Sequence, residues 1–184
     1  MTCENSNPVN SSTTQPILPL ANGNTWNYGR TFVRADSSVS DTTFITMTAS
    51  GPDTIEAFIG YRITNLVVLP IGAVLLANHP DGIYAKDDPS SYPQPSPITP
   101  VLKFLKYPTT VGDTLTYKNL LIRTKNTFEA VTATAGTFSC YHYEVLDDSL
   151  VAEVWLSPGV GLVRSWIQIG SSKRFEDLRS FVLN

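Results

Sequence analysis

The sequence predicts an all-β domain built on a curved, mostly antiparallel sheet of about ten strands, with few or no helices. In most patterned segments, apolar and polar residues alternate with a period of two, as they do in half-buried strands. The 21 Thr and 17 Ser outnumber all charged residues, and Thr favours strands whereas Ser favours turns. Thirteen Pro and eleven Gly interrupt the chain throughout, which disfavours long helices. These patterns leave open whether the sheet forms an open barrel or a sandwich-like meander.

The composition is that of one globular domain. The chain has 184 residues, of which 42% are hydrophobic and 16% charged, and its formal net charge is −3. A chain of this length suits a single domain and buries roughly 70% of its unfolded surface. Its slightly acidic balance offers no basic excess to neutralise phosphates, which argues against a nucleic-acid partner. No run of about 18 apolar residues occurs, so the sequence predicts no transmembrane span.

Residues 1–16 are expected to form a flexible polar leader, or tether, that precedes the domain. From Glu4 to Pro16 the leader is almost wholly Asn, Ser, Thr, Pro and Gln, and it buries too little apolar surface to become ordered. A bacterial lipoprotein whose signal peptide has been removed begins at a lipidated Cys followed by such a leader, and Cys3 occupies that place. Cys3 is therefore either a lipid anchor of the native precursor or an ordinary residue of the tail. The first interpretation places the protein outside the cytoplasm, in the periplasm or anchored to the outer membrane.

Residues 17–184 are expected to form a single β domain that begins with three strands. Residues 25–34 alternate, with Trp26 and Tyr28 on one face, and residues 42–49 alternate in the same way. The Ser50–Asp53 stretch is expected to end the second strand, because Gly followed by Pro is typical of turns. Residues 54–65 follow as a third strand, which either starts directly or after one helical turn at Ile55–Phe58.

The middle of the chain predicts a hairpin and a long loop. Asn78–Gly82 is expected to join residues 73–77 to residues 83–86, with Gly82 in the left-handed region. Residues 87–100 contain five prolines and predict an extended Pro-rich surface loop. Further strands are predicted at residues 102–107, 114–123, 127–133, 137–146, 151–156, 161–169 and 175–183. The short connections between them favour an antiparallel meander over alternating strands and helices.

One segment of the sequence recurs. Pro19–Tyr28 matches Pro108–Tyr117, and in both a Gly-Asn or Gly-Asp pair precedes a strand with large apolar residues at its second and fourth positions. This match is either a common way of starting a strand or the trace of two related half-sheets. The sequence alone does not separate these two interpretations.

The opening segment Gly23–Tyr28 resembles bacterial exported domains of unknown function, many of which are lipoproteins. The likeness extends to Val111–Thr114, Ala135–Cys140 and Trp155–Val163, where a Gly-Thr-Phe-x-Cys strand precedes a Pro-Gly-Val-Gly-Leu-Val hairpin. The resemblance spans residues 19–184 and implies a strongly curved antiparallel sheet like the open barrels of periplasmic lipoprotein carriers. The Pro-rich insertion departs from the pattern, and the resemblance transfers no catalytic residue.

No pattern in the sequence identifies a reaction centre. The sharpest candidate is Cys140-x-His142-x-Glu144, whose alternation aims three potential metal ligands at one face of a strand. The other histidine, His79, lies in a predicted turn, so a buried Cys beside a hydrogen-bonded His explains the spacing better. Paired aspartates at 87–88 and 147–148 are interpreted as turn caps, and no nucleophile elbow, phosphate loop or EF-hand is present. We therefore predict no enzyme activity, no metal and no cofactor; a hydrolase with an unfamiliar site is the catalytic alternative.

Aromatic residues on the predicted strands are the remaining indication of function. Rings on a half-polar concave sheet can bind sugar rings or a lipid chain, although the plainer interpretation is that they fill the core. Trp166 is expected to share its face with Leu162 and Arg164. The sequence favours a non-enzymatic, exported envelope domain of lipoprotein type that binds an apolar or glycan-like ligand, with a structural or protein-interaction module as the alternative. The candidate ligand-binding residues are Trp26, Tyr28, Trp155 and Trp166.

Overall fold

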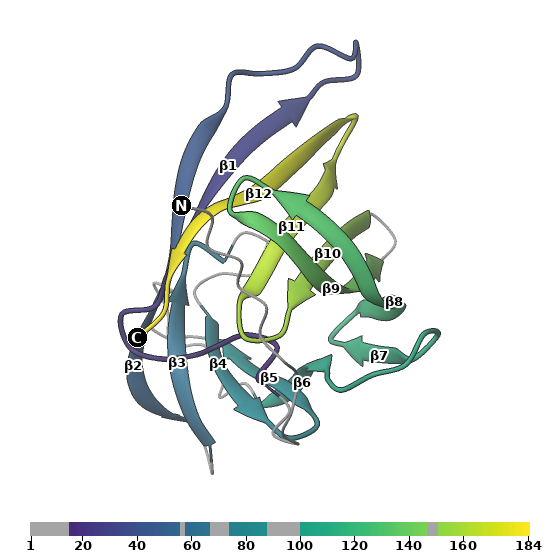
Figure 1. Ribbon diagram of the computed structural model, residues 1–184. Coiled ribbons are helices and arrows are strands. Elements are labelled where there is room, and N and C mark those ends of the chain that lie inside the picture. The colour runs from purple at the N-terminus through teal and green to yellow at the C-terminus, as the bar shows by residue number, and fades with distance from the viewer. Residues whose placement is uncertain (1–14, 56–57, 67–73, 88–99, 147–150) are drawn as a thin grey trace, which may run out of the picture.

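The computed structural model describes residues 15–55, 58–66, 74–87, 100–146 and 151–184, and these residues form an all-β fold (Figure 1). The predicted fold class is confirmed, with twelve strands in place of about ten and no helix within the described ranges. Cys3, the leader up to residue 14 and most of the Pro-rich loop lie outside the described residues. The strands are β1 (Thr25–Val33), β2 (Thr43–Ile55), β3 (Phe58–Thr64), β4 (Val74–His79), β5 (Gly82–Asp87), β6 (Leu102–Lys106), β7 (Thr114–Tyr117), β8 (Leu120–Ala133), β9 (Gly136–Leu146), β10 (Val151–Ser157), β11 (Gly161–Ile169) and β12 (Ser172–Val182).

All twelve strands belong to one antiparallel sheet in the order β6-β5-β4-β3-β2-β1-β12-β11-β10-β9-β8-β7. Every pair of neighbours in the sheet is also adjacent in the sequence except β1 and β12, which pair from Thr25↔Val182 to Val33↔Lys173. The sheet curls until its two edge strands, β6 and β7, approach each other (Figure 1). The result is a nearly closed, barrel-like sheet. We call the gap between β6 and β7 the seam, and it lies in the middle of the chain.

The strand order divides the sheet into two halves of six strands. Strands β1–β6 and β7–β12 are each a meander, and both run in the same direction around the barrel. The junction of β1 with β12 is therefore the counterpart of the seam between β7 and β6. The recurring sequence segment falls at the start of each half, as the interpretation of two related half-sheets requires.

The turns that open the two halves have the same hydrogen bonds. Gly23 and Gly112 both take left-handed conformations, with φ of 85° and 88°. The residue that follows each glycine pairs across to the next strand, Asn24 with Ala49 and Asp113 with Thr124. Four bonds of 2.9 Å make this pattern: Gly23 N to Ala49 O, Ala49 N to Asn24 O, Gly112 N to Thr124 O and Thr124 N to Asp113 O. The two segments therefore share the hydrogen bonds of their turns as well as their sequence pattern.

The end predicted for the second strand is wrong. β2 continues past Ser50–Asp53 to Ile55, and its register with β3 shifts between Ser50 and Asp53. The Gly-Pro pair that predicts a turn is absorbed as an irregularity within a long strand, where a bulge tolerates a residue without a ladder donor. Ile55 pairs with Phe58 at the end of the β2–β3 ladder, on either side of residues 56–57. The alternative of a helical turn at Ile55–Phe58 falls partly on these two residues, which lie outside the described ones.

The strand predicted over residues 114–123 is also wrong, because the structure places a hairpin inside it. β7 ends at Tyr117 and pairs with β8 from Tyr117↔Leu120 to Thr114↔Arg123. The turn depends on Lys118, whose φ of 54° is left-handed, a conformation that Lys rarely takes and that the sequence does not signal. Conversely, residues 120–133 form one strand in place of the two expected, with register shifts against β9 near Asn126.

The sheet buries one face inside the barrel and parts of the other. Inward residues from both halves form the main core cluster, which includes Trp26, Tyr28, Leu76 and Leu162. A smaller cluster of Val131, Cys140, Trp155 and Val163 covers the outer face of the second half. Within the described ranges, nothing helical has the length and apolarity to cross a membrane.

Candidate ligand site inside the barrel

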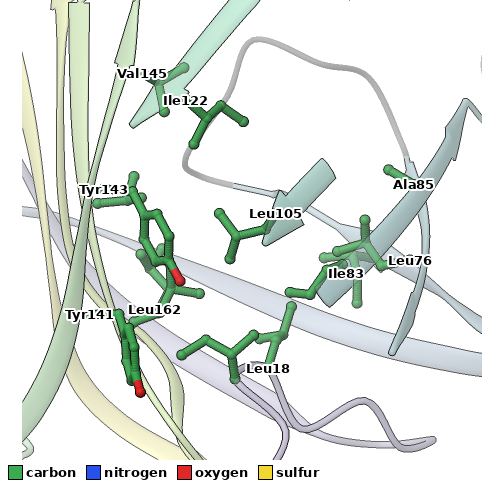
Figure 2. Close-up of a cluster of buried hydrophobic side chains, with 14 of the residues drawn as sticks. Leu18, Leu76, Ile83, Ala85, Leu105, Ile122, Tyr141, Tyr143, Val145 and Leu162 are labelled. Atoms are coloured by element: carbon green, nitrogen blue, oxygen red, sulfur yellow. The ribbon is translucent and has the colours of Figure 1, made fainter. Parts of the chain in front are cut away.

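The barrel encloses an apolar lumen walled by both halves of the sheet. Because successive side chains of a strand point to opposite faces, every second residue of each strand faces this space. Figure 2 shows Leu76 and Ile83 of the first half opposite Tyr143 and Leu162 of the second, with Leu105 between them.

A cavity of about 30 Å³ remains within this packing. A water molecule needs about 10–15 Å³ and at least two polar partners, so a cavity with an apolar lining stays dry. This space is suited to apolar atoms and unsuited to a sugar. Its twelve lining residues are all apolar: Leu18, Met47, Leu66, Leu76, Ile83, Phe104, Leu105, Ile122, Val145, Val154, Leu156 and Leu162.

Residues 15–20, which we call the N-terminal plug, enter the lumen without joining the sheet. Ile17 and Leu18 are 1% and 3% exposed, and Leu18 lines the cavity. The plug therefore occupies space that would otherwise belong to the lumen. Three hydrogen bonds hold its carbonyls: Gly159 N to Pro16 O (2.8 Å), Asn78 Nδ2 to Leu18 O (2.9 Å) and Asn24 Nδ2 to Pro19 O (2.8 Å).

Trp26 and Tyr28, the first two candidate residues, are completely buried in the lumen wall. The indole Nε1 of Trp26 donates to Val160 O (2.6 Å), and the hydroxyl of Tyr28 donates to Leu162 O (3.0 Å). Burial, followed by the charge of Glu176, raises the pKa of Tyr28 well above its usual range. Carbonyl groups of the protein accept both of these hydrogen bonds. Because both side chains are completely buried, neither ring has a face open to solvent.

Four polar side chains of β1, β11 and β12 meet on the inner face of the sheet: Arg30, Ser165, Arg174 and Glu176. We call them the arginine–glutamate cluster. Glu176 is 1% exposed. Burial lowers the pKa of Arg174, which the nearby carboxylate of Glu176 partly offsets. A buried carboxylate needs such partners, because an isolated buried charge is strongly unfavourable. None of these residues is among the candidates predicted from the sequence.

The seam is closed by side chains. The rings of Phe104 on β6 and Tyr117 on β7 pack edge to face with centroids 5.2 Å apart. Lys106 Nζ lies 2.7 Å from Asp113 Oδ2, and this contact, followed by bonds from Thr110 and Thr109, lowers the pKa of Asp113. Phe104 also lines the cavity, so the seam forms part of the lumen wall. In this part of the wall, no ladder of backbone hydrogen bonds joins the described strands β6 and β7.

The Cys140-x-His142-x-Glu144 pattern lies on one face of β9, as its alternation predicts, and that face is the outer one. Burial raises the pKa of the Cys140 thiol to about 12, so this thiol stays protonated. His142 Nδ1 lies 2.9 Å from Glu129 Oε2, and His142 Nε2 lies 3.4 Å from Glu153 Oε2. Among the residues that the structure describes, no three His, Cys, Asp or Glu side chains are arranged so that they could hold a metal ion.

Trp155 and Trp166, the other two candidate residues, lie on the outer face of the barrel, away from Trp26 and Tyr28. Trp155 is 8% exposed and stacks on the His142 ring with centroids 4.2 Å apart. Trp166 donates from Nε1 to Glu153 (2.9 Å), and Lys173 Nζ lies 4.6 Å above its ring. The structure therefore does not bring the four candidates into one site, and protein groups already contact both outer rings.

The prediction that Trp166 shares its face with Leu162 is wrong. Leu162 belongs to the core inside the barrel, whereas Trp166 packs against the outer cluster. The register of β10 with β11 shifts between Trp155 and Leu156, which pair with Arg164 and Leu162. Such a bulge adds one residue to a strand and reverses the alternation beyond it.

His79, the other histidine, ends β4 in a small surface group. Its Nδ1 contacts Asp81, and its ring packs edge to face against Phe58 and Tyr84. Lys103, followed by His79, lowers the pKa of Asp81 to about 2. These contacts join the β4–β5 hairpin to β6. The predicted hairpin at Asn78–Gly82 is confirmed, since His79 pairs with Gly82.

The solved structures that resemble this fold include two bacterial proteins. A candidate exported protein with a YmcC-like fold from Bacteroides fragilis matches 92% of this chain and 100% of its own, with 14% identity and a TM-score of 0.51. A candidate lipoprotein from Parabacteroides distasonis matches 93% of this chain and 100% of its own, with 17% identity and a TM-score of 0.47. No protein-family model and no curated protein matches the sequence. The first neighbour shows a shared fold alone, and neither tests the short motifs behind the predicted resemblance.

Proposed function

We propose that this protein is a non-enzymatic, exported envelope domain of lipoprotein type that binds an apolar chain inside its barrel. The observation that carries the proposal is the dry cavity whose twelve lining residues are all apolar. The polar leader that follows Cys3 supports tethering, and the exported character given to the Bacteroides fragilis neighbour supports the location outside the cytoplasm.

The lumen is favoured over the outer face as the ligand site because of what covers each surface. A glycan site needs an aromatic face open to a sugar ring, whereas His142 covers Trp155 and Lys173 covers Trp166. An apolar site needs apolar walls and exclusion of water, which the lumen offers. An apolar chain is therefore the ligand class that we propose.

Binding requires that the N-terminal plug withdraw. The present cavity of about 30 Å³ is far smaller than the sites of about 300–1,000 Å³ that hold small molecules. Leu18 is the plug residue that reaches the cavity, and a few hydrogen bonds hold the plug, whereas continuous ladders hold the strands. Withdrawing Leu18 from the lumen therefore enlarges the cavity without breaking any pairing between strands.

Wild-type protein is expected to bind the neutral apolar dye 1-N-phenylnaphthylamine, and Leu18→Ala is expected to bind it about tenfold more tightly. Exposing a buried leucine to water costs about 1.5–3 kcal/mol, and each 1.4 kcal/mol corresponds to a factor of ten in affinity. The alanine variant avoids much of that cost. Fluorescence titration measures both dissociation constants.

The matched control is Leu183→Ala, which truncates a leucine that is 36% exposed and does not line the cavity. It is expected to bind the dye as the wild type does. Absence of binding by the wild type contradicts the proposal even if Leu18→Ala binds, because a truncated leucine leaves a dry, ligand-accepting cavity in many cores.

The tether is tested separately. In the source organism, the protein is expected to incorporate an alkyne-labelled fatty acid at Cys3 and to sediment with membranes, since two or more acyl chains anchor a protein stably. Cys3→Ser is expected to lose both the label and the sedimentation. Cys140→Ser is the control and keeps both, because that thiol is buried. Label in neither the wild type nor the control contradicts lipidation.

A further inference from the structure

The arginine–glutamate cluster faces the same lumen as the cavity. Arg30 lies two residues beyond Tyr28 on β1, and Glu176 lies two residues before Leu178 on β12, so each shares the inward face of a core residue. Arg30 and Glu176 are also directly paired across the two strands. Ser165 pairs with Val154, which lines the cavity. The cluster is therefore the polar end of an otherwise apolar lumen.

Glu176 is the centre of the cluster, and both of its oxygens are engaged. Oε1 lies 2.9 Å from Arg30 Nε and 2.8 Å from Arg174 Nε. Oε2 accepts a hydrogen bond of 2.8 Å from the hydroxyl of Ser165. The carboxylate thus accepts a hydrogen bond from Arg30 Nε and forms an ion pair with the neighbouring guanidinium of Arg174.

The cluster carries two positive charges and one negative charge. The side chains of Arg30 and Arg174 are 22% and 19% exposed, whereas Glu176 is 1% exposed, so the cations lie closer to solvent than the anion. Among the described residues, no hydrogen bond engages the two terminal Nη groups of Arg30. A guanidinium held through Nε presents these groups as a planar fork, the geometry that matches a carboxylate or a phosphate.

We propose that the arginine–glutamate cluster binds the anionic head group of an amphiphile whose apolar chain lies in the lumen. This inference rests on the proposed function and narrows its ligand class to an acyl chain that ends in a carboxylate or a phosphate. Arg30 makes the direct contact through its Nη groups, and Arg174 adds positive charge beside it. Glu176 positions both guanidinium groups and does not touch the ligand.

The test compares cis-parinaric acid with its methyl ester, which have the same chain and differ in the charge of the head group. Wild-type protein is expected to bind the acid about tenfold more tightly than the ester, because the carboxylate accepts charge-assisted hydrogen bonds from Arg30 that the ester accepts only weakly. Arg30→Gln is expected to bind both probes with equal affinity, at the level of the ester. Fluorescence titration gives the ratio of the two constants within each variant, so a partly unfolded sample does not disturb it.

The matched control is Arg179→Gln, which removes the same charge from an exposed residue of β12 that stacks over Phe44. It is expected to keep the preference for the acid. If Arg30→Gln does not fold, the salt dependence of the wild type decides: the affinity for the acid falls with ionic strength and that for the ester does not. Displacement by lysophosphatidate against displacement by palmitate then identifies phosphate or carboxylate as the preferred head group.

Equal affinity of the wild type for acid and ester overturns this inference and leaves the proposed function standing. An unchanged preference for the acid in Arg30→Gln overturns it as well, because another group then holds the head. Absence of binding by both probes overturns the inference and the proposed function together.

Discussion

Replacing Trp26 by alanine is expected to lower the free energy of unfolding by about 3–5 kcal/mol, the range for a large aromatic side chain removed from a core. Trp26 is completely buried, so the substitution leaves a void against the plug and the β10–β11 turn. It also leaves the carbonyl of Val160 without the indole N–H that donates to it at 2.6 Å. Chemical denaturation followed by circular dichroism measures the change.

Trp166→Ala is the matched control for this substitution. Its ring is half-buried on the outer face, where it contacts Glu153 and Lys173 at the surface. The loss of stability is expected to be clearly smaller than for Trp26. Equal losses for the two variants contradict the assignment of Trp26 to the lumen wall and of Trp166 to the outside.

Much of the fold could be predicted from the sequence because strand alternation is a local signal. The alternation at Trp26 and Tyr28 locates β1 and its inward face, and Gly161–Ile169 is predicted with the bounds that the structure shows. Alternation fails where one residue breaks the period. The bulge beside Leu162 reverses the face of Trp166, and the left-handed Lys118 makes a hairpin without a Gly or Asn at that position.

The pairing that joins the two halves of the sheet could not be predicted, because its two strands lie far apart in the sequence. β1 and β12 are paired although the whole domain separates them in sequence, and no local pattern encodes such a contact. The recurring turn at Gly23 and Gly112 is a partial exception. It marks the start of each six-strand half of the sheet. If the two halves are related, the first strand of each half is expected to lie beside the last strand of the other, as β1 lies beside β12 and β7 beside β6.

The candidate site was missed for a related reason. The candidates predicted from the sequence were aromatic rings, histidine and cysteine, whereas the cluster consists of Arg30, Ser165, Arg174 and Glu176. A usable signal was present: Arg30 continues the inward series of Trp26 and Tyr28, and a charge at an inward strand position requires a partner. Only the pairing of β1 with β12 shows that this partner is Glu176.

Glu176→Gln is expected to lower the free energy of unfolding by about 3 kcal/mol. Removing one partner of a buried ion pair costs about 3–5 kcal/mol, because the remaining charge stays buried without compensation. The lower end applies here, since the two guanidinium groups keep about a fifth of their surface in water. Glutamine preserves the shape and the hydrogen-bonding carbonyl, so the loss reports the charge. Denaturant unfolding at neutral pH measures it.

The neighbouring residue supplies the control, because Asp177 lies on the opposite face of the same strand. Asp177 pairs with Arg164 at 2.6 Å, but the two side chains are 42% and 36% exposed. Exposed ion pairs contribute about 0–1 kcal/mol, so Asp177→Asn is expected to change stability by no more than that. Two adjacent acid-to-amide substitutions then differ only in which side of the sheet they face. Equal effects of the two variants contradict a carboxylate sealed inside the barrel, and with it the polar end of the lumen on which the head-group site depends.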